Sequence, residues 1–203
     1  MDDKQDQAAF DIGAALFRKR RTLSRIVAMQ FAFQADLKNA WDEETNDLEA
    51  FKELAKNILQ ADGDDENPSV DDRRSFTHAD FNAAWKYATT LIKGVLANRN
   101  ELDTLICNVT QNWSLQRISL MDRAILRVAT FEILKSPKGV TPATAINEAI
   151  EIAKSYSLDN SPRFINGILD KIRKNLQEKA SSEEPPAEEA STPSEETTGE
   201  ADS

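Results

Sequence analysis

The 203-residue sequence has few of the residues from which catalytic or covalently stabilised sites are built. A single cysteine, Cys107, excludes an internal disulfide, and a single histidine, His78, excludes the two Glu-x-x-His helices of a di-metal carboxylate bundle. The six glycines are widely scattered and form neither a P-loop nor a dinucleotide-binding loop. No stretch has the character of a secretory signal, a lipidation motif or a bilayer-spanning segment. We therefore expect a non-enzymatic protein that uses no cofactor or metal, avoids membranes and works in a reducing cytoplasm.

Apolar residues recur three and four positions apart along most of the chain, which is the spacing of amphipathic helices. The segment Asp122–Leu134 carries them on nearly every side and predicts a central helix that its neighbours cover. Thr141-Pro142 and Ser161-Pro162 each combine a capping residue with a proline suited to the first turn, so both predict helix starts. The same spacing predicts helices over Leu48–Leu59, Phe81–Leu96 and Leu102–Trp113. The expected fold class is all-α, a compact helical bundle of about seven helices.

The helical rhythm breaks between residues 61 and 80, which contain Gly63, Pro68 and six acidic residues ahead of Asp80. This composition predicts a polar connection, and a short helix over Val70–Phe76 stays open as an alternative. We expect an N-terminal extension over residues 1–17 and a helical domain over residues 18–178. That domain would consist of two small subdomains, one ending near residue 60 and the other covering residues 81–178.

The C-terminal end has a different composition from the rest of the chain. Residues 180–203 contain eight acidic residues, no basic residue, no aromatic residue and no large aliphatic residue. Such a segment cannot bury enough apolar surface to offset the entropy of ordering, so we predict a disordered acidic C-terminal tail over residues 179–203. The tail supplies −8 of the formal net charge of −10 and leaves −2 for the rest of the chain. The low pI of about 4.7 is therefore no argument against an RNA partner.

Positive charge is concentrated near the start of the chain. No acidic residue occurs between Ile12 and Ala35, and this interval holds the cations Arg18, Lys19, Arg20, Arg21 and Arg25. Thr22 predicts a helix start, where a bound phosphate would meet free backbone N–H groups and basic side chains together. On charge alone, a solvated run that merely keeps the segment soluble is an equally good interpretation.

Four motifs follow one another along the chain: R-R-x-x-x-R with the following A-M-Q-F-A-F-Q, then D-R-A-I-L-R-V-A-T-F-E-I-L, then A-I-N-E-A-I-E-I-A-K, and finally S-P-R-F-I-N-G-I-L-D-K-I. In this order, and over roughly Arg18 to Leu176, the sequence resembles the NusB family of bacterial transcription antitermination factors. The resemblance implies an all-helical protein that pairs with NusE, a small-subunit ribosomal protein. It also implies binding to the boxA element of single-stranded nascent RNA during rRNA transcription, within an elongation complex that contains other Nus factors.

The resemblance assigns roles to individual residues as well. It implies RNA contacts by the cations of the basic segment, by Gln30, and by Phe33, for which core packing is the alternative. It further implies a second RNA-contacting edge at Asn160, Arg163 and Phe164, where a cap at Ser161 and core packing of Phe164 form the alternative. Asp122 matches an acidic position at the NusE contact, and a plain helix-terminal charge is the alternative. The predicted RNA-binding residues are thus Arg18, Lys19, Arg20, Arg21, Arg25, Gln30, Phe33, Asn160, Arg163 and Phe164.

Two other functions compete with RNA binding. A helical protein–protein adaptor, or a homodimer without RNA binding, would use only the apolar helix faces. A NusB-like accessory domain of an rRNA cytosine methyltransferase is disfavoured, because the chain stops in a tail and has no cofactor-binding domain. Titration with a short boxA RNA, with and without NusE, separates these functions.

Overall fold

A computed structural model describes residues 2–42, 47–61, 77–110, 114–135 and 137–183. Within these residues the chain forms six α-helices and two short 3-10 helices, without any strand, which confirms the predicted all-α bundle. The elements are α1 (Asp2–Lys38), α2 (Leu48–Ala61), α3 (His78–Val109), η2 (Leu115–Arg117), α4 (Leu120–Lys135), η3 (Pro137–Gly139), α5 (Pro142–Tyr156) and α6 (Ser161–Glu183). Most of the predicted polar connection and the optional helix over Val70–Phe76 lie outside the described residues. Residues 179–183 belong to helix α6, so the predicted start of the tail at residue 179 is wrong, and the rest of the predicted tail lies outside the described residues.

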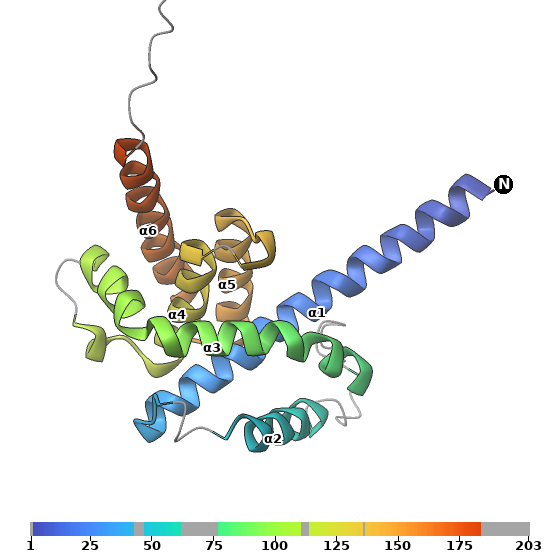
Figure 1. Ribbon diagram of the computed structural model, residues 1–203, viewed down its shortest axis with the longest axis horizontal. Coiled ribbons are helices and arrows are strands. Elements are labelled where there is room, and N and C mark those ends of the chain that lie inside the picture. Colours follow the sequence, from blue (N-terminus) through green and yellow to red (C-terminus); the bar gives the residue numbers. More distant parts are fainter. Residues whose placement is uncertain (1, 43–46, 62–76, 111–113, 136, 184–203) are drawn as a thin grey trace, which may run out of the picture.

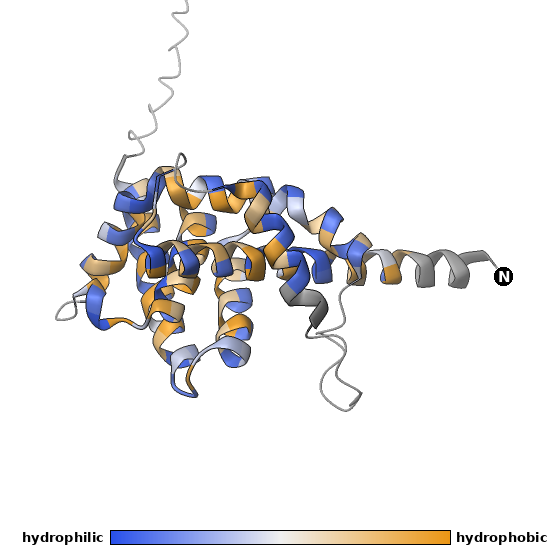
Figure 2. Cartoon of the chain, turned by 90° about the horizontal axis from the view of Figure 1, so that it is seen from below, coloured by the Kyte–Doolittle hydropathy of each residue, from blue (hydrophilic) through white to orange (hydrophobic). Residues whose placement is uncertain are grey.

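Helix α4 lies at the centre of the bundle. It contacts α1, α3, α5 and α6, while α1 and α3 also contact each other (Figure 1). Every residue of α4 from Ala124 to Ile133 is buried, as predicted for a central helix. Hydrophobic positions of the helices face the interior, and hydrophilic positions face outward (Figure 2). Among the described residues, no helix combines the length and the apolar character that a membrane crossing needs.

Helix α1 is one continuous helix of 37 residues, and its N-terminal part projects away from the bundle (Figure 1). Thr22 lies in its interior, where its hydroxyl is 3.2 Å from the carbonyl oxygen of Arg18 and donates to a Glu148 carboxylate oxygen at 2.6 Å. The predicted helix start at Thr22 is therefore wrong, and with it the phosphate site at a helix N-terminus. The residues just before Thr22 are mostly alanine, leucine, arginine and lysine, which favour helix, and no proline interrupts them.

Helix α3 joins two segments that the sequence predicted as separate helices, Phe81–Leu96 and Leu102–Trp113. The polar interval at residues 97–101 contains neither proline nor glycine, so it continues the helix. Asn98 supports the continuous helix, because its side-chain amide donates to the carbonyl oxygen of Gly94 at 2.7 Å. This junction explains why the described helices number six rather than about seven. Trp113 itself lies outside the described residues.

The starts of α3 and α5 are fixed by capping residues. Thr77 and Asp80 form a capping box at α3, in which each side chain accepts a hydrogen bond from the backbone N–H of the other. At α5 the Thr141 hydroxyl accepts from the backbone N–H of Thr144 at 3.2 Å, which confirms the predicted Thr141-Pro142 start. Helix α6 begins at Ser161, so the second predicted start is confirmed in position.

Buried ion pairs fasten the C-terminal part of α1 to its neighbours. Arg127 of α4 is almost fully buried and donates to Asp36 of α1 at 2.7 Å and to Asp103 of α3 at 2.6 Å. Its guanidinium carbon also lies 4.6 Å from the centre of the Trp41 ring. The indole N–H of Trp41 donates to Asp36 at 3.1 Å. These contacts neutralise a cation that would otherwise be very costly to bury.

Candidate nucleic-acid interface

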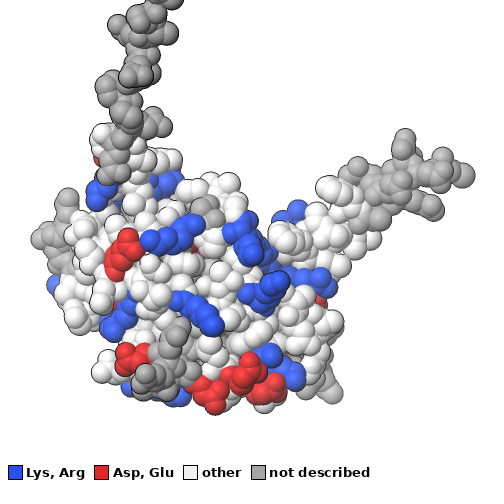
Figure 3. Space-filling view, in the orientation of Figure 1, with Lys and Arg blue, Asp and Glu red and all other residues white. Residues whose placement is uncertain are grey.

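A groove runs between α1 and α3 at the point where the projecting part of α1 leaves the bundle. Its volume is about 410 Å³. It is lined by Phe17, Arg20, Arg21, Ser24, Ala83, Ala84, Lys86, Tyr87 and Lys138. Four of these residues are cations and two are aromatic, and no carboxylate lines the groove. Lys and Arg side chains gather in this region of the surface in Figure 3. The composition suits a polyanion whose bases can stack on rings.

The aromatic side of the groove is organised around Arg21. Its guanidinium carbon lies 3.5 Å from the centre of the Tyr87 ring and 5.4 Å from the centre of the Phe17 ring. Cation–π contact of this kind holds the guanidinium plane in one place while its N–H groups can still donate to an oxygen. Phe17 is 62% exposed, so most of its ring is free to contact a ligand.

A buried network holds Tyr87 in position. The Tyr87 hydroxyl donates to Glu132 at 2.6 Å, and Arg25 Nε donates to the other oxygen of Glu132 at 2.8 Å. Arg25 also donates to Glu148 at 3.2 Å. Burial raises the pKa of the Tyr87 hydroxyl, and the negative charge of Glu132 raises it further. Burial alone would lower the pKa of Arg25, but Glu132 and Glu148 outweigh burial, so that pKa is raised. Tyr87 therefore stays neutral and Arg25 stays charged.

Arg20 lines the groove and also forms an ion pair with a carboxylate of α3. Its Nε lies 3.2 Å from Asp80, the residue of the α3 capping box. Burial raises the pKa of the Asp80 carboxyl, but hydrogen bonds from Thr77 and Arg20 outweigh it, so the pKa is lowered. The Arg20 side chain is well exposed to solvent, which weakens the pair. A guanidinium has five N–H donors, so Arg20 can bind a phosphate without leaving Asp80.

The basic segment predicted from the sequence divides into two groups. Arg20 and Arg21 line the groove, and Arg18 and Lys19 are exposed or half-buried beside them on α1. Arg25 does not belong with them: it is 3% exposed and bonded to two carboxylates. Its burial and its two ion pairs do not favour the predicted contact of Arg25 with RNA, which stays a prediction.

The remaining predicted RNA residues do not line the groove. Gln30 follows Arg21 by about two and a half turns and points to the opposite side of α1. Phe33 and Phe164 are partly buried against the core, in agreement with the alternative interpretation of both rings. Asn160 and Arg163 are exposed at the start of α6, so they are available for contacts at a separate place.

Asp122 has a buried environment that favours a structural role, while its predicted contact with NusE stays a prediction. It is buried, and its two carboxylate oxygens accept hydrogen bonds from Ser157 at 2.6 Å and from Ser161 at 3.1 Å. These bonds tie the start of α4 to the connection between α5 and α6. They also show that the Ser161 hydroxyl donates to Asp122.

Four cationic or aromatic residues of the groove were not predicted from the sequence. Phe17 directly precedes the basic segment, whereas Lys86, Tyr87 and Lys138 lie elsewhere in the chain. Lys86 and Tyr87 come from α3, and Lys138 comes from η3, so all three are far from the basic segment in sequence. Lys138 has a φ of 56° and is followed by Gly139 with a φ of 70°. The adjacent S-P-K-G sequence signals a turn, but nothing in it indicates which helix the turn approaches.

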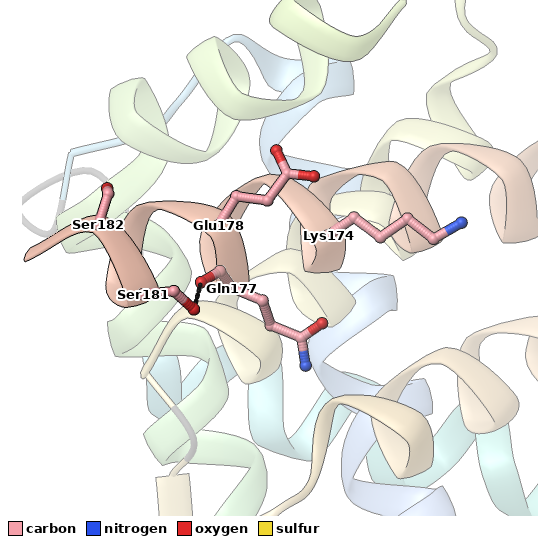
Figure 4. A pocket seen from close by; sticks show the side chains of 5 residues that line it. All are labelled: Lys174, Gln177, Glu178, Ser181 and Ser182. Atoms are coloured by element: carbon pink, nitrogen blue, oxygen red, sulfur yellow. Dashed lines mark hydrogen bonds between the residues drawn. The ribbon is translucent and has the colours of Figure 1, made fainter. Parts of the chain in front are cut away.

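A second hollow, of about 460 Å³, lies on the surface of α6. Figure 4 shows the labelled side chains that line it, Lys174, Gln177, Glu178, Ser181 and Ser182, and all of them project from this one helix. The Ser181 hydroxyl donates to the backbone carbonyl of Gln177, so its hydrogen-bond partner lies within the same helix. No side chain from another helix faces this group across the hollow. Across the described residues, no group of three or more His, Cys, Asp or Glu side chains is placed to hold a metal ion.

The fold and the groove together define a class: an all-helical protein with one cationic, aromatic groove suited to nucleic acid. The NusB family profile matches residues 22–174 of the chain. A transcription antitermination protein NusB from Elusimicrobium minutum (strain Pei191) is 37% identical over 154 residues, which cover 76% of this chain and 93% of the relative. The chain therefore belongs to the NusB family of transcription antitermination proteins.

Solved structures agree with this assignment. NusB from T. maritima is 30% identical, covers 77% of this chain and 90% of that chain, and superposes with a TM-score of 0.52. A solved complex of the antitermination factors NusB and NusE with dsRNA contains a chain that is 21% identical. That match covers 77% of this chain and 97% of the other at a TM-score of 0.52, and it shows a shared fold.

Proposed function

We propose that this protein binds boxA-type single-stranded RNA in the groove between α1 and α3, together with NusE, during rRNA transcription in the cytoplasm. The observation that carries the proposal is the stack of Tyr87, Arg21 and Phe17 beside three further cations. In this proposal the protein binds RNA and catalyses no reaction. Its further partners are other Nus factors of the elongation complex.

The groove favours single-stranded over double-stranded RNA. Duplex RNA is recognised mainly by its shape and its 2′-hydroxyl groups, whereas unpaired bases stack on aromatic rings and on arginine planes. The exposed ring of Phe17 offers such a surface in the groove, and Arg21 beside it can donate N–H groups to an oxygen of the RNA. Arg20, Lys86 and Lys138 stand around them as candidates for phosphate contacts.

NusE enters the proposal through the family and through the solved complex in which a NusB chain is joined with NusE and dsRNA. Asp122 does not contribute to a NusE surface in this proposal, since its carboxylate is bonded inside the bundle. A protein adaptor without RNA binding would leave the cations of the groove without a function, and no observation favours it.

The proposal is tested by fluorescence anisotropy with a labelled boxA-type RNA of twelve nucleotides, with and without NusE. Arg20→Ala combined with Arg21→Ala should weaken binding and reduce the slope of log affinity against log salt by about 0.7 for each lost phosphate contact. Lys86→Ala combined with Lys138→Ala should act in the same direction. Lys171→Ala, on the exposed side of α6, is the matched control and should bind as the wild type does.

Strandedness is tested with the same RNA annealed to its complement. Tighter binding of the single strand by the wild type is expected, and the aromatic groove predicts that Arg21→Ala reduces this preference. Unchanged affinity and salt slope in both double variants would contradict the proposal and favour the adaptor.

A further inference from the structure

The projecting part of α1 carries two strongly exposed aromatic side chains. Phe10 is 71% exposed and Phe17 is 62% exposed, and Gly13 between them has no atom within 4 Å of the place a Cβ would take. This segment precedes residue 22, where the match to the NusB family begins. The groove described above extends to this segment through Phe17.

Phe10 and Phe17 lie on the same face of α1 as the groove residues. Seven residues make nearly two helical turns, so the two rings are separated by about 20° around the helix and by about 10 Å along it. Arg21 and Ser24, which line the groove, follow on this face within about 40° of Phe17. Ile12 and Leu16 are also exposed, but they lie about 100–160° away from the two rings around the helix.

We propose that this face of α1 continues the RNA site, with Phe17 and Phe10 as successive stacking surfaces for unpaired bases that leave the groove. The inference rests on the proposed function of the groove. It adds a second segment of single-stranded RNA, beyond the nucleotides held at Arg21, as the ligand of the N-terminal extension.

The cations beside Phe17 favour RNA over a protein as the occupant of this face. Arg18, Lys19, Arg20 and Arg21 follow Phe17 directly, and no acidic residue lies between Ile12 and Ala35. Phe10 is followed by Asp11 and preceded by Asp2, Asp3 and Asp6, so the attraction for RNA is strongest at Phe17 and falls toward Phe10. Aromatic rings next to cations, on a face continuous with a cationic groove, form the pattern by which proteins hold single-stranded nucleic acid. The exposed apolar residues Ile12 and Leu16, which are not aromatic, serve as the comparison for the two rings.

The test uses the full-length protein and three labelled RNAs: the boxA-type twelve-mer and the same RNA extended by four uridines at its 5′ or its 3′ end. The wild type should bind one of the extended RNAs more tightly than the twelve-mer. Phe10→Ala combined with Phe17→Ala should weaken binding of that extended RNA by about fivefold or more. Ile12→Ala combined with Leu16→Ala should leave its affinity unchanged.

Direct stacking is measured with 2-aminopurine placed in the extension. Its fluorescence should fall when the wild type binds and fall less with the Phe10→Ala and Phe17→Ala protein. Equal affinities of the aromatic variant and the wild type for every RNA would overturn the inference, and so would a change in sedimentation from dimer to monomer without a change in RNA affinity. Either result leaves the proposed function standing if Arg20→Ala with Arg21→Ala still weakens binding of the twelve-mer.

Discussion

Arg25 provides the sharpest test of how the structure divides the basic segment. Arg25→Met keeps an apolar stem of similar length but removes the guanidinium. Glu132, which is 1% exposed, would then retain only the hydrogen bond from Tyr87. Glu148 is partly exposed and can be hydrated instead. The main cost of the substitution is therefore one uncompensated buried carboxylate.

The expected loss is about 3–5 kcal/mol, which is the usual cost of removing one partner from a buried ion pair. A domain of this kind has about 5–15 kcal/mol of stability, so the loss should be large in a urea titration followed by circular dichroism. Glu132→Gln combined with Arg25→Met removes the stranded charge and should recover a substantial part of the loss. Arg163→Met, which removes an exposed arginine, should change stability by less than about 0.5 kcal/mol.

One result would refute this reasoning. If Arg25→Met costs less than about 1 kcal/mol and weakens RNA binding as strongly as Arg21→Ala, then Arg25 contacts RNA as the sequence suggested. Additive effects of Arg25→Met and Glu132→Gln on stability would also contradict the ion pair, because substitutions of two residues that share an ion pair do not have additive effects.

Three further predictions concern stability. Gly94→Ala should destabilise the fold by about 1–3 kcal/mol, because the new Cβ would lie 2.0 Å from the Phe131 ring. This cost outweighs the preference of about 1 kcal/mol for alanine over glycine in a helix. A more stable variant in a urea titration would refute this contact. Tyr87→Phe should cost about 1–3 kcal/mol at neutral pH by leaving Glu132 short of a donor. Because the folded-state pKa of Tyr87 is raised above the unfolded value of about 10, this advantage is complete below that pH and shrinks above it; a pH-independent difference between the two proteins would contradict the hydrogen bond. Asp122→Ala should lower the free energy of unfolding by about 1–3 kcal/mol, because Ser157 and Ser161 lose their acceptor. The affinity of the folded variant for NusE, measured by calorimetry, should stay unchanged. Weaker association without a loss of stability would show that Asp122 contacts NusE.

The C-terminal half of the fold could be predicted because its signals are local. Thr141 and Pro142 specify a helix start within one turn, and the apolar residues of Asp122–Leu134 specify a helix covered on most sides. The continuity of α1 and α3 was missed for a physical reason. A polar interval on the outside of a helix and a polar loop have the same composition, and only the absence of proline and glycine favours the helix.

The candidate site could be predicted only in part. Arg20 and Arg21 were found because they are neighbours in sequence, whereas Lys86 and Lys138 reach the groove through the packing of other elements. The sequence groups Arg25 with the exposed cations because the carboxylates that pair with it are 107 and 123 residues away. A buried cation can be told from an exposed one only when these distant partners are known. The pattern of charges along the chain does not contain that information.

The buried ion pairs at the two ends of one stretch of α1 fix its rotation about its own axis. Arg25 bonds to Glu132, and Asp36, about three turns further on, bonds to Arg127. A rotation by one residue, about 100°, would strand charges at both ends, so the core permits α1 a single rotational setting. Because the projecting segment is a rigid continuation of the same helix, the direction in which Phe10 and Phe17 point is dictated from inside the bundle. One residue inserted between Arg21 and Thr22 would leave the buried Leu23, Ser24 and Arg25 in place and turn the whole extension by about 100° to another side of the molecule.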